Sequence, residues 1–207
     1  MTKYISAVVI LWLVLGAVCV NAGTYTFSPY VKDLGDLAHQ YYYTWGINWT
    51  LPGGEQIDSA VLTYKNIWDW TVETDHLYTH LLDTVSASSG WKTVVNYQTV
   101  TIQQYDNQGG GDNFAGQGLS LGVWSDPYGG SPRNFNLVYD IPATHLSWLA
   151  DGNFGFGIDP DCHYYNDGIE LKIITSNTNQ VIPEPFSMAL ASLGLGTLAG
   201  LRRFAKR

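Results

Sequence analysis

Apolar and polar side chains alternate along most of the chain between residues 23 and 175, and this two-residue period is typical of strands with one buried face. In the stretch 57–67, for example, Ala60, Leu62 and Tyr64 fall on one side of the expected strand. The 3.6-residue period of a helix is hard to find in the same region. The pattern predicts strands at 45–49, 57–67, 76–82, 91–97, 99–105, 119–124, 135–141, 154–158 and 169–175.

Turn-forming residues separate the predicted strands. Clusters of Gly, Asn, Asp and Ser lie at 86–90, 106–113, 125–134 and 150–153. One helical turn is expected at 143–149. Eight or nine strands at this spacing predict an all-β fold, a two-sheet antiparallel sandwich that is jelly-roll-like, in a single domain at 23–175. A mixed α/β fold is the alternative.

The N-terminal segment 1–22 has the features of a secretory signal peptide. Lys3 supplies the positive charge, an apolar run follows, and small residues precede the expected cleavage site between Ala22 and Gly23. An uncleaved membrane anchor is one alternative, but the apolar run is short for a spanning helix. Cys19 raises a second alternative, lipidation, which lacks the small residue that should precede the cysteine.

The C-terminal segment has the features of a second signal. After a polar linker at 176–182, sixteen uncharged residues at 186–201 predict a transmembrane helix that would span a bilayer only marginally. Four basic residues follow among the last six, beginning with Arg202 and Arg203. Basic residues flanking a membrane helix stay in the cytoplasm, so the body of the protein is expected outside.

Between the linker and the apolar segment lies the triplet Pro183, Glu184 and Pro185. The triplet, the helix and the basic end together resemble the PEP-CTERM sorting signal of Gram-negative bacteria over residues 183–207. Ile182 stands where the family pattern often has Val, which is a mild departure. The resemblance implies recognition by an exosortase, cleavage near the triplet and transfer to the cell surface, in systems that accompany exopolysaccharide and biofilm production. It implies nothing about the body.

Removing both signals makes the protein more acidic. The whole 207-residue chain has a formal charge of −8, but the stretch 23–182 holds five basic and seventeen acidic residues, a charge of about −12. Nucleic acid and anionic lipid need basic partners, so we expect neither as a main ligand. The expected partners during export are signal peptidase and the exosortase, with membrane contact only through the C-terminal helix before processing. Cys162 is the one cysteine left in the body, which excludes an intramolecular disulfide there.

An acidic segment near the end of the body suggests calcium. Asp159, Asp161, Asp167 and Glu170 occupy positions 1, 3, 9 and 12 of a spacing that superficially matches an EF-hand loop. The match fails at position 6, where Tyr164 replaces the required glycine, and strands are expected on both sides. Two interpretations stay open: a calcium site on a loop between strands, and a solvated acidic turn.

Two other groupings do not predict a site. His76 and His80 would lie about 13 Å apart on a strand, too far to share one metal ion. Cys162 and His163 are adjacent and point to opposite faces of an extended chain, so they do not form a catalytic dyad by themselves. A buried structural cysteine is the preferred interpretation.

Aromatic residues give the strongest functional indication. The chain has 8 Trp and 14 Tyr, more large rings than a single small core needs. Exposed rings can stack on the apolar faces of sugars. We assign a candidate ligand platform to Trp68, Trp70, Trp124 and Tyr128, although Trp and Tyr are also good strand residues that pack between sheets.

Motifs for common catalytic chemistry are missing, including GxSxG, the P-loop and the dinucleotide fingerprint. The favoured interpretation is therefore an exported, non-catalytic surface or matrix protein that interacts with carbohydrate or exopolysaccharide. A secreted glycosidase or lyase is one alternative, because a glycosidase needs only two suitably placed carboxylates. A purely structural matrix component is the other.

Overall fold

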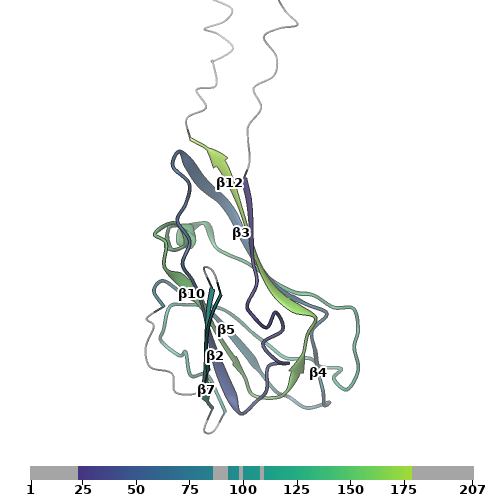
Figure 1. Cartoon of the computed structure of the whole chain (residues 1–207). Helices are drawn as coiled ribbons and strands as arrows, with labels where there is room; N and C mark the ends of the chain where they lie inside the picture. The colour runs from purple at the N-terminus through teal and green to yellow at the C-terminus, as the bar shows by residue number, and fades with distance from the viewer. Residues whose placement is uncertain (1–22, 86–92, 98–99, 108–109, 179–207) are drawn as a thin grey trace, which may run out of the picture. The chain divides into compact units, whose positions relative to one another are not determined.

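The computed structural model describes residues 23–85, 93–97, 100–107 and 110–178. Within these ranges the chain forms two large sheets and one small one, and every strand pairing is antiparallel (Figure 1). The helical structure is limited to the 3-10 helix η1 (Ala143–His145) and the short α2 (Leu146–Ala150). The predicted all-β class, with antiparallel sheets in a sandwich-like arrangement, is confirmed.

The strand orders show how the chain alternates between the sheets. The four-stranded sheet has the order β1–β12–β3–β9, with bounds Gly23–Phe27, Gly168–Asn177, Glu55–Lys65 and Leu137–Asp140. The six-stranded sheet has the order β6–β7–β2–β10–β5–β8, with bounds Thr93–Tyr97, Val100–Asp106, Tyr41–Ile47, Phe154–Pro160, Leu77–Leu82 and Leu119–Trp124. A third pair joins β4 (Trp68–Asp69) to β11 (Tyr164–Tyr165).

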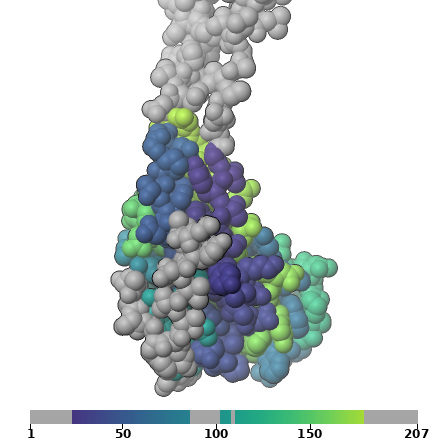
Figure 2. Space-filling view, viewed as in Figure 1, coloured from purple at the N-terminus to yellow at the C-terminus, as the bar shows by residue number. Residues whose placement is uncertain are grey.

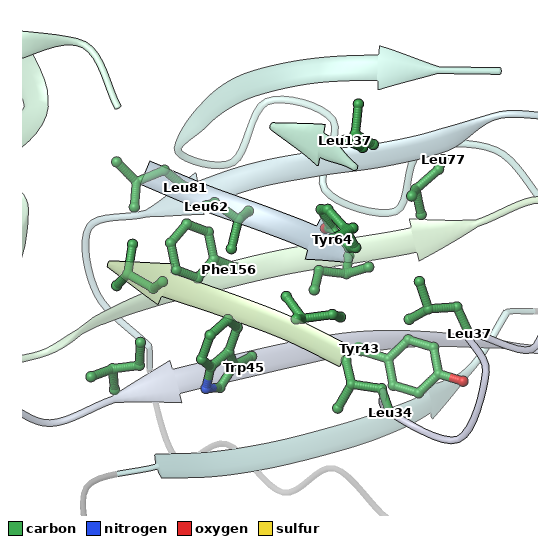
Figure 3. Close-up of a cluster of buried hydrophobic side chains, with 14 of the residues drawn as sticks. Leu34, Leu37, Tyr43, Trp45, Leu62, Tyr64, Leu77, Leu81, Leu137 and Phe156 are labelled. Atoms are coloured by element: carbon green, nitrogen blue, oxygen red, sulfur yellow. The ribbon is translucent and has the colours of Figure 1, made fainter. Parts of the chain in front are cut away.

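Large side chains from both sheets form one hydrophobic core. Tyr43 and Trp45 come from β2, Leu62 and Tyr64 from β3, and Phe156 from β10 (Figure 3). Each of these side chains is at most 2% exposed. The alternation noted in the sequence explains this arrangement, because every second residue of a strand faces the same side.

One hydrogen bond crosses the core between the sheets. The hydroxyl of Tyr64, on β3, lies 3.0 Å from the hydroxyl of Thr79, on β5, and both residues are fully buried. Two buried hydroxyls therefore satisfy each other without water.

The outer face of the six-stranded sheet is covered at its central strand. Phe156 and Ile158 of β10 face the core, while Gly155 and Gly157 face outward. The ring of Phe114 lies directly over Gly157, where an added Cβ would come within 2.6 Å of it. Phe114 belongs to the loop between β7 and β8, which we call the covering loop. This loop covers the outer face at β10, and β10 is buried along its whole length.

Most predicted strands coincide with observed ones, although several bounds differ and the short strands β4 and β11 were not predicted. The pattern at 45–49 indicated a strand reaching residue 49, but β2 ends at Ile47. The edge strand β1 was not predicted, although Tyr25 and Phe27 alternate there with threonines and pack against the core. β1 pairs with β12. A stretch of only five residues at the start of the domain gave no local indication of this partner.

Candidate ligand-binding surface and buried carboxylate cluster

The segment around β4 directs aromatic side chains outward and a carboxylate inward. The ring of Trp68 stacks on Tyr165 of β11, with centroids 4.4 Å apart and planes 23° apart. Trp70 is 51% exposed, and its backbone N–H donates to the carbonyl of His163 at 3.2 Å. Asp69, between the two tryptophans, is fully buried. This is the reverse of the usual distribution of apolar and polar residues.

The end of β8 and the loop after it contribute the second half of the surface. Trp124 is partly buried, and its ring is stacked with Phe135 at 5.8 Å and tilted against Tyr164 at 5.6 Å. Tyr128 is 62% exposed. The guanidinium of Arg133 lies 4.4 Å from the centre of the Tyr128 ring and donates to the Tyr128 carbonyl at 2.7 Å. Arg133 therefore holds the ring of Tyr128 in position from one face.

Hydrogen bonds join the two segments. The buried carboxylate of Asp126 accepts from the backbone N–H of Asp69 at 3.2 Å and from that of Tyr128 at 3.0 Å. The N–H of Gly130 donates to the Asp69 carbonyl at 2.7 Å. Gly129 is required at the contact, because a Cβ there would lie 1.5 Å from the carbonyl oxygen of Thr71.

The four predicted platform residues thus lie on two segments that are bonded to each other, and we call them the aromatic surface: Trp68, Trp70, Trp124 and Tyr128. Figure 2 shows the loop around residue 130, in teal-green, at the surface of the described part of the protein. Sequence reasoning missed the residues that support this surface. Asp126 had a local signal, since an Asp before a Pro in a loop often accepts from the backbone two residues ahead; its bond to Asp69 had none.

A cluster of metal-ligating groups lies beside the inward face of β4. One ligand atom each from Asp69, Asp75 and Cys162 lies within 4.8 Å of the others. Asp69 Oδ1 accepts from the N–H of Thr71 at 3.1 Å, but Oδ2 is buried without a hydrogen-bond partner, as is Oδ2 of Asp75. Burial raises the pKa of Asp69. It also raises the pKa of the Cys162 thiol to about 11.

Tyr164 adds a further buried polar atom to this region. Its side chain is fully buried, and its hydroxyl has no hydrogen-bond partner. Burial raises the pKa of Tyr164, and the charges of Asp69, Cys162 and Asp75 raise it further. Tyr164 pairs directly with Asp69 in the β4–β11 ladder, so the two side chains lie on the same face of that strand pair. We call Asp69, Asp75 and Cys162, with the Tyr164 hydroxyl, the buried cluster.

The residues proposed as calcium ligands have separate partners. Asp159 is fully buried and accepts from the side chain of Asn107 at 3.0 Å and from the backbone and side chain of Asn113 at 2.6 and 2.9 Å. Its pKa is raised to about 6, because burial outweighs these donors. Asp161 accepts from the N–H of Gly111 at 2.6 Å. Both carboxylates thereby hold the loop that carries Phe114.

The other two members of that set lie elsewhere, Asp167 in the turn before β12 and Glu170 on β12. Asp167 accepts from the side chain of Asn66 at 3.1 Å, and Glu170 forms an ion pair with Lys65 at 2.5 Å. Among the described residues, the group of ligand atoms within 4.8 Å is the buried cluster and not these four carboxylates. Calcium binding by the acidic segment stays a prediction.

The two histidines of β5 and the segment before it contact different carboxylates. His80 is buried; its Nε2 lies 3.0 Å from Asp112 and its Nδ1 lies 3.1 Å from the carbonyl of Gln117. His76 Nδ1 lies 3.9 Å from Asp161. His80 therefore serves as a further attachment point for the covering loop.

The proposed targeting residues lie outside the described part of the chain, except for Gly23, which begins β1. This applies to Ala22 and the rest of the signal peptide, to the PEP triplet, to the helix predicted at 186–201 and to the basic end. Among the described residues, no helix has the length and apolar character needed to cross a membrane.

No family model matches this chain, and neither a curated protein nor a solved structure matches it significantly.

Proposed function

We propose that this protein is an exported, non-catalytic surface protein that binds polysaccharide through the aromatic surface. The observation that carries the proposal is the exposure of Trp70 (51%) and Tyr128 (62%) on two mutually bonded segments. The apolar surface of such large rings is normally removed from water by packing in the core. Stacking on the apolar face of a sugar would also remove it from water. Val72 and Phe135, also exposed, enlarge the apolar area around them.

The proposal includes sorting by an exosortase through the C-terminal tail. The strand arrangement suits this role. β12 runs for ten residues from Gly168, shortly after β11, to Asn177, and it therefore includes the first two residues of the stretch predicted as a linker at 176–182. At about 3.3 Å per residue, its ends lie roughly 30 Å apart. A body held at its C-terminal end would therefore present the aromatic surface away from the point of attachment (Figure 1).

The finer fold class belongs to the same proposal. A jelly-roll-like sandwich is supported by the antiparallel sheets and by a chain that passes from β2 in the six-stranded sheet to β3 in the four-stranded one and later returns. Sandwiches of this kind occur in lectin domains.

The two carboxylates at the contact between the segments of the aromatic surface are buried, which favours binding over hydrolysis by this pair. Asp69 and Asp126 are 0% and 4% exposed, and Asp126 accepts two backbone N–H donors. A glycosidase needs two carboxyl groups that reach the scissile bond. Neither of these groups lies at the surface where the sugar would stack.

The test measures binding and turnover in parallel. The full chain in detergent micelles is applied to a glycan array that includes bacterial exopolysaccharides, and bound sugars are then assayed for reducing ends. We expect binding without release of reducing sugar. Trp70→Ala and Tyr128→Ala should each weaken affinity roughly 10-fold, about 1.4 kcal/mol, without lowering the melting temperature, because both rings are exposed.

Tyr30→Ala is the matched control. Tyr30 is an aromatic residue exposed to a similar extent, 58%, on another segment. This variant should bind as the wild type does. Equal binding by all variants would contradict the proposal, release of reducing sugar would support the enzyme, and the absence of any bound sugar would support a purely structural role.

A further inference from the structure

The buried cluster contains two carboxylates that no basic side chain neutralises among the described residues. Asp69 and Cys162 are 0% and 7% exposed, and Oδ2 of Asp75 is buried although the residue as a whole is partly exposed. Among the described residues, no lysine, arginine or histidine forms an ion pair with Asp69 or Asp75. Burying carboxylates without a cation is costly, so such groups usually pair or coordinate a metal.

Three buried polar atoms that lack an N–H or O–H partner point to a missing ligand. The hydroxyl of Tyr164 has no hydrogen-bond partner. The buried Oδ2 atoms of Asp69 and Asp75 have only the Cys162 thiol beside them. Nearly all buried polar atoms in native proteins have a partner. Three such atoms in one region are explained together if a cation lies among them.

The donor types indicate which cation. Two carboxylate oxygens and one sulfur are ligands that Zn²⁺ accepts, whereas Ca²⁺ and Mg²⁺ take oxygen alone. Two ligand atoms of one tetrahedral zinc ion lie about 3.5 Å apart, given the Zn–S and Zn–O bond lengths. The ligand atoms of the cluster lie within 4.8 Å of one another, so binding requires the most distant pair to move closer by about 1 Å.

We propose that Asp69, Asp75 and Cys162 bind a divalent transition-metal ion of the zinc class, with the Tyr164 hydroxyl or a water as a further ligand. The three residues come from β4, from the loop before β5 and from the turn between β10 and β11. The ion would therefore cross-link the segment that runs from β4 to Asp75 with the turn at Cys162, which is distant in sequence. This inference concerns the cluster alone and does not depend on sugar binding.

The test uses the full chain, purified under reducing conditions, freed of metal by chelation and titrated separately with Zn²⁺, Ca²⁺ and Co²⁺. We expect one Zn²⁺ per chain, a higher melting temperature with Zn²⁺, and a near-ultraviolet charge-transfer band with Co²⁺ that reports a thiolate ligand. Cys162→Ala should abolish that band, while Cys19 remains unchanged in every variant.

Asp75→Asn tests the site without relying on Cys162. Because Asp75 is only partly buried, this variant should fold, and its affinity for Zn²⁺ should fall by roughly 100-fold or more, since outer-shell changes alone cost 10–100-fold. Glu73→Gln is the matched control: this exposed acid lies on the same loop outside the cluster and should leave the affinity unchanged.

Several results would overturn the proposal. They are the absence of stoichiometric Zn²⁺ binding, affinity unchanged in both Cys162→Ala and Asp75→Asn, or stabilisation by Ca²⁺ alone. If Cys162→Ala does not fold, the comparison of Asp75→Asn with Glu73→Gln decides.

Discussion

Asp159 is a single buried carboxylate that organises a whole loop. Its two oxygens accept from Asn107 and Asn113, and through them it holds the loop that places Phe114 over the sheet. These donors favour the ionised form, while burial favours the protonated form. Burial is the larger effect, and the pKa of Asp159 rises from its ordinary value of 3.8 to about 6.

This raised pKa makes stability depend on pH. Because the folded state favours the protonated carboxyl, the stabilisation from Asp159 is full below pH 4 and is lost as the pH rises through about 6. The free energy of unfolding of the wild type, relative to that of Asp159→Asn, should therefore decrease between pH 4 and pH 7. Urea denaturation of both proteins across this range measures the difference.

Asp140→Asn provides the comparison, because Asp140 is an exposed carboxylate at the end of β9. Its difference from the wild type should change little over the same pH range. If the free energy of unfolding of the wild type, relative to that of Asp159→Asn, instead increased with pH, the hydrogen bonds from Asn107 and Asn113 would outweigh the effect of burial.

At the scale of elements, β10 is buried on both faces, although only the face toward the core carries large apolar side chains. It alternates large residues toward the core with glycines toward the outside; Phe114 of the covering loop fills the space above Gly157, and Val85 lies over Gly155. A sequence pattern of Phe-Gly-Phe-Gly therefore marks a close approach of another segment, which is one of the recognised reasons for glycine in a strand.

Gly157→Ala tests this packing. The added Cβ would lie 2.6 Å from the ring of Phe114, and the backbone of the adjacent Asn113 is held by Asp159 at 2.6 Å, so the ring has little freedom to move away. We expect a loss of about 1–3 kcal/mol in the free energy of unfolding, measured by urea denaturation.

Gly53→Ala is the control for this substitution. No atom lies within 4 Å of the Cβ that it adds, so the change in stability should stay within about 0.5 kcal/mol. Equal stability of Gly157→Ala and Gly53→Ala would show that the covering loop shifts freely.

At the scale of the molecule, the domain begins and ends on neighbouring strands. Gly23 of β1 pairs with Thr175 of β12, so the chain enters and leaves the domain at the same edge of the four-stranded sheet. The segments that we interpret as targeting signals are therefore attached side by side.

For sorting, we predict that the surface form lacks the residues after Pro185. Intact-mass measurement of protein recovered from the cell surface should show the loss of 186–207, because the triplet separates a polar linker from the predicted membrane helix. Glu184→Ala should keep the tail and stay in the membrane fraction. A surface-located wild-type protein that retains 186–207 would contradict the prediction.

The local pattern of the chain was sufficient for the fold class and for part of the candidate site. Strand periodicity depends on side chains two residues apart, so β3, β5, β10 and β12 could be recognised without knowing their partners. The excess of large rings also indicated the platform residues, because a core of this size has limited room for them. The partners within each sheet and the short pair β4–β11 had no comparable local signal.

By itself, the sequence determined the alternation, the turns, the acidity of the body and the aromatic character of the proposed ligand surface. Only the tertiary structure decided which carboxylates are buried and what they contact. Nothing in the local sequence indicated that Asp69 is fully buried or that Asp167 accepts a hydrogen bond from Asn66. The physical reason is that burial and coordination depend on neighbours far away in sequence: Asp69 meets Cys162 across more than ninety residues.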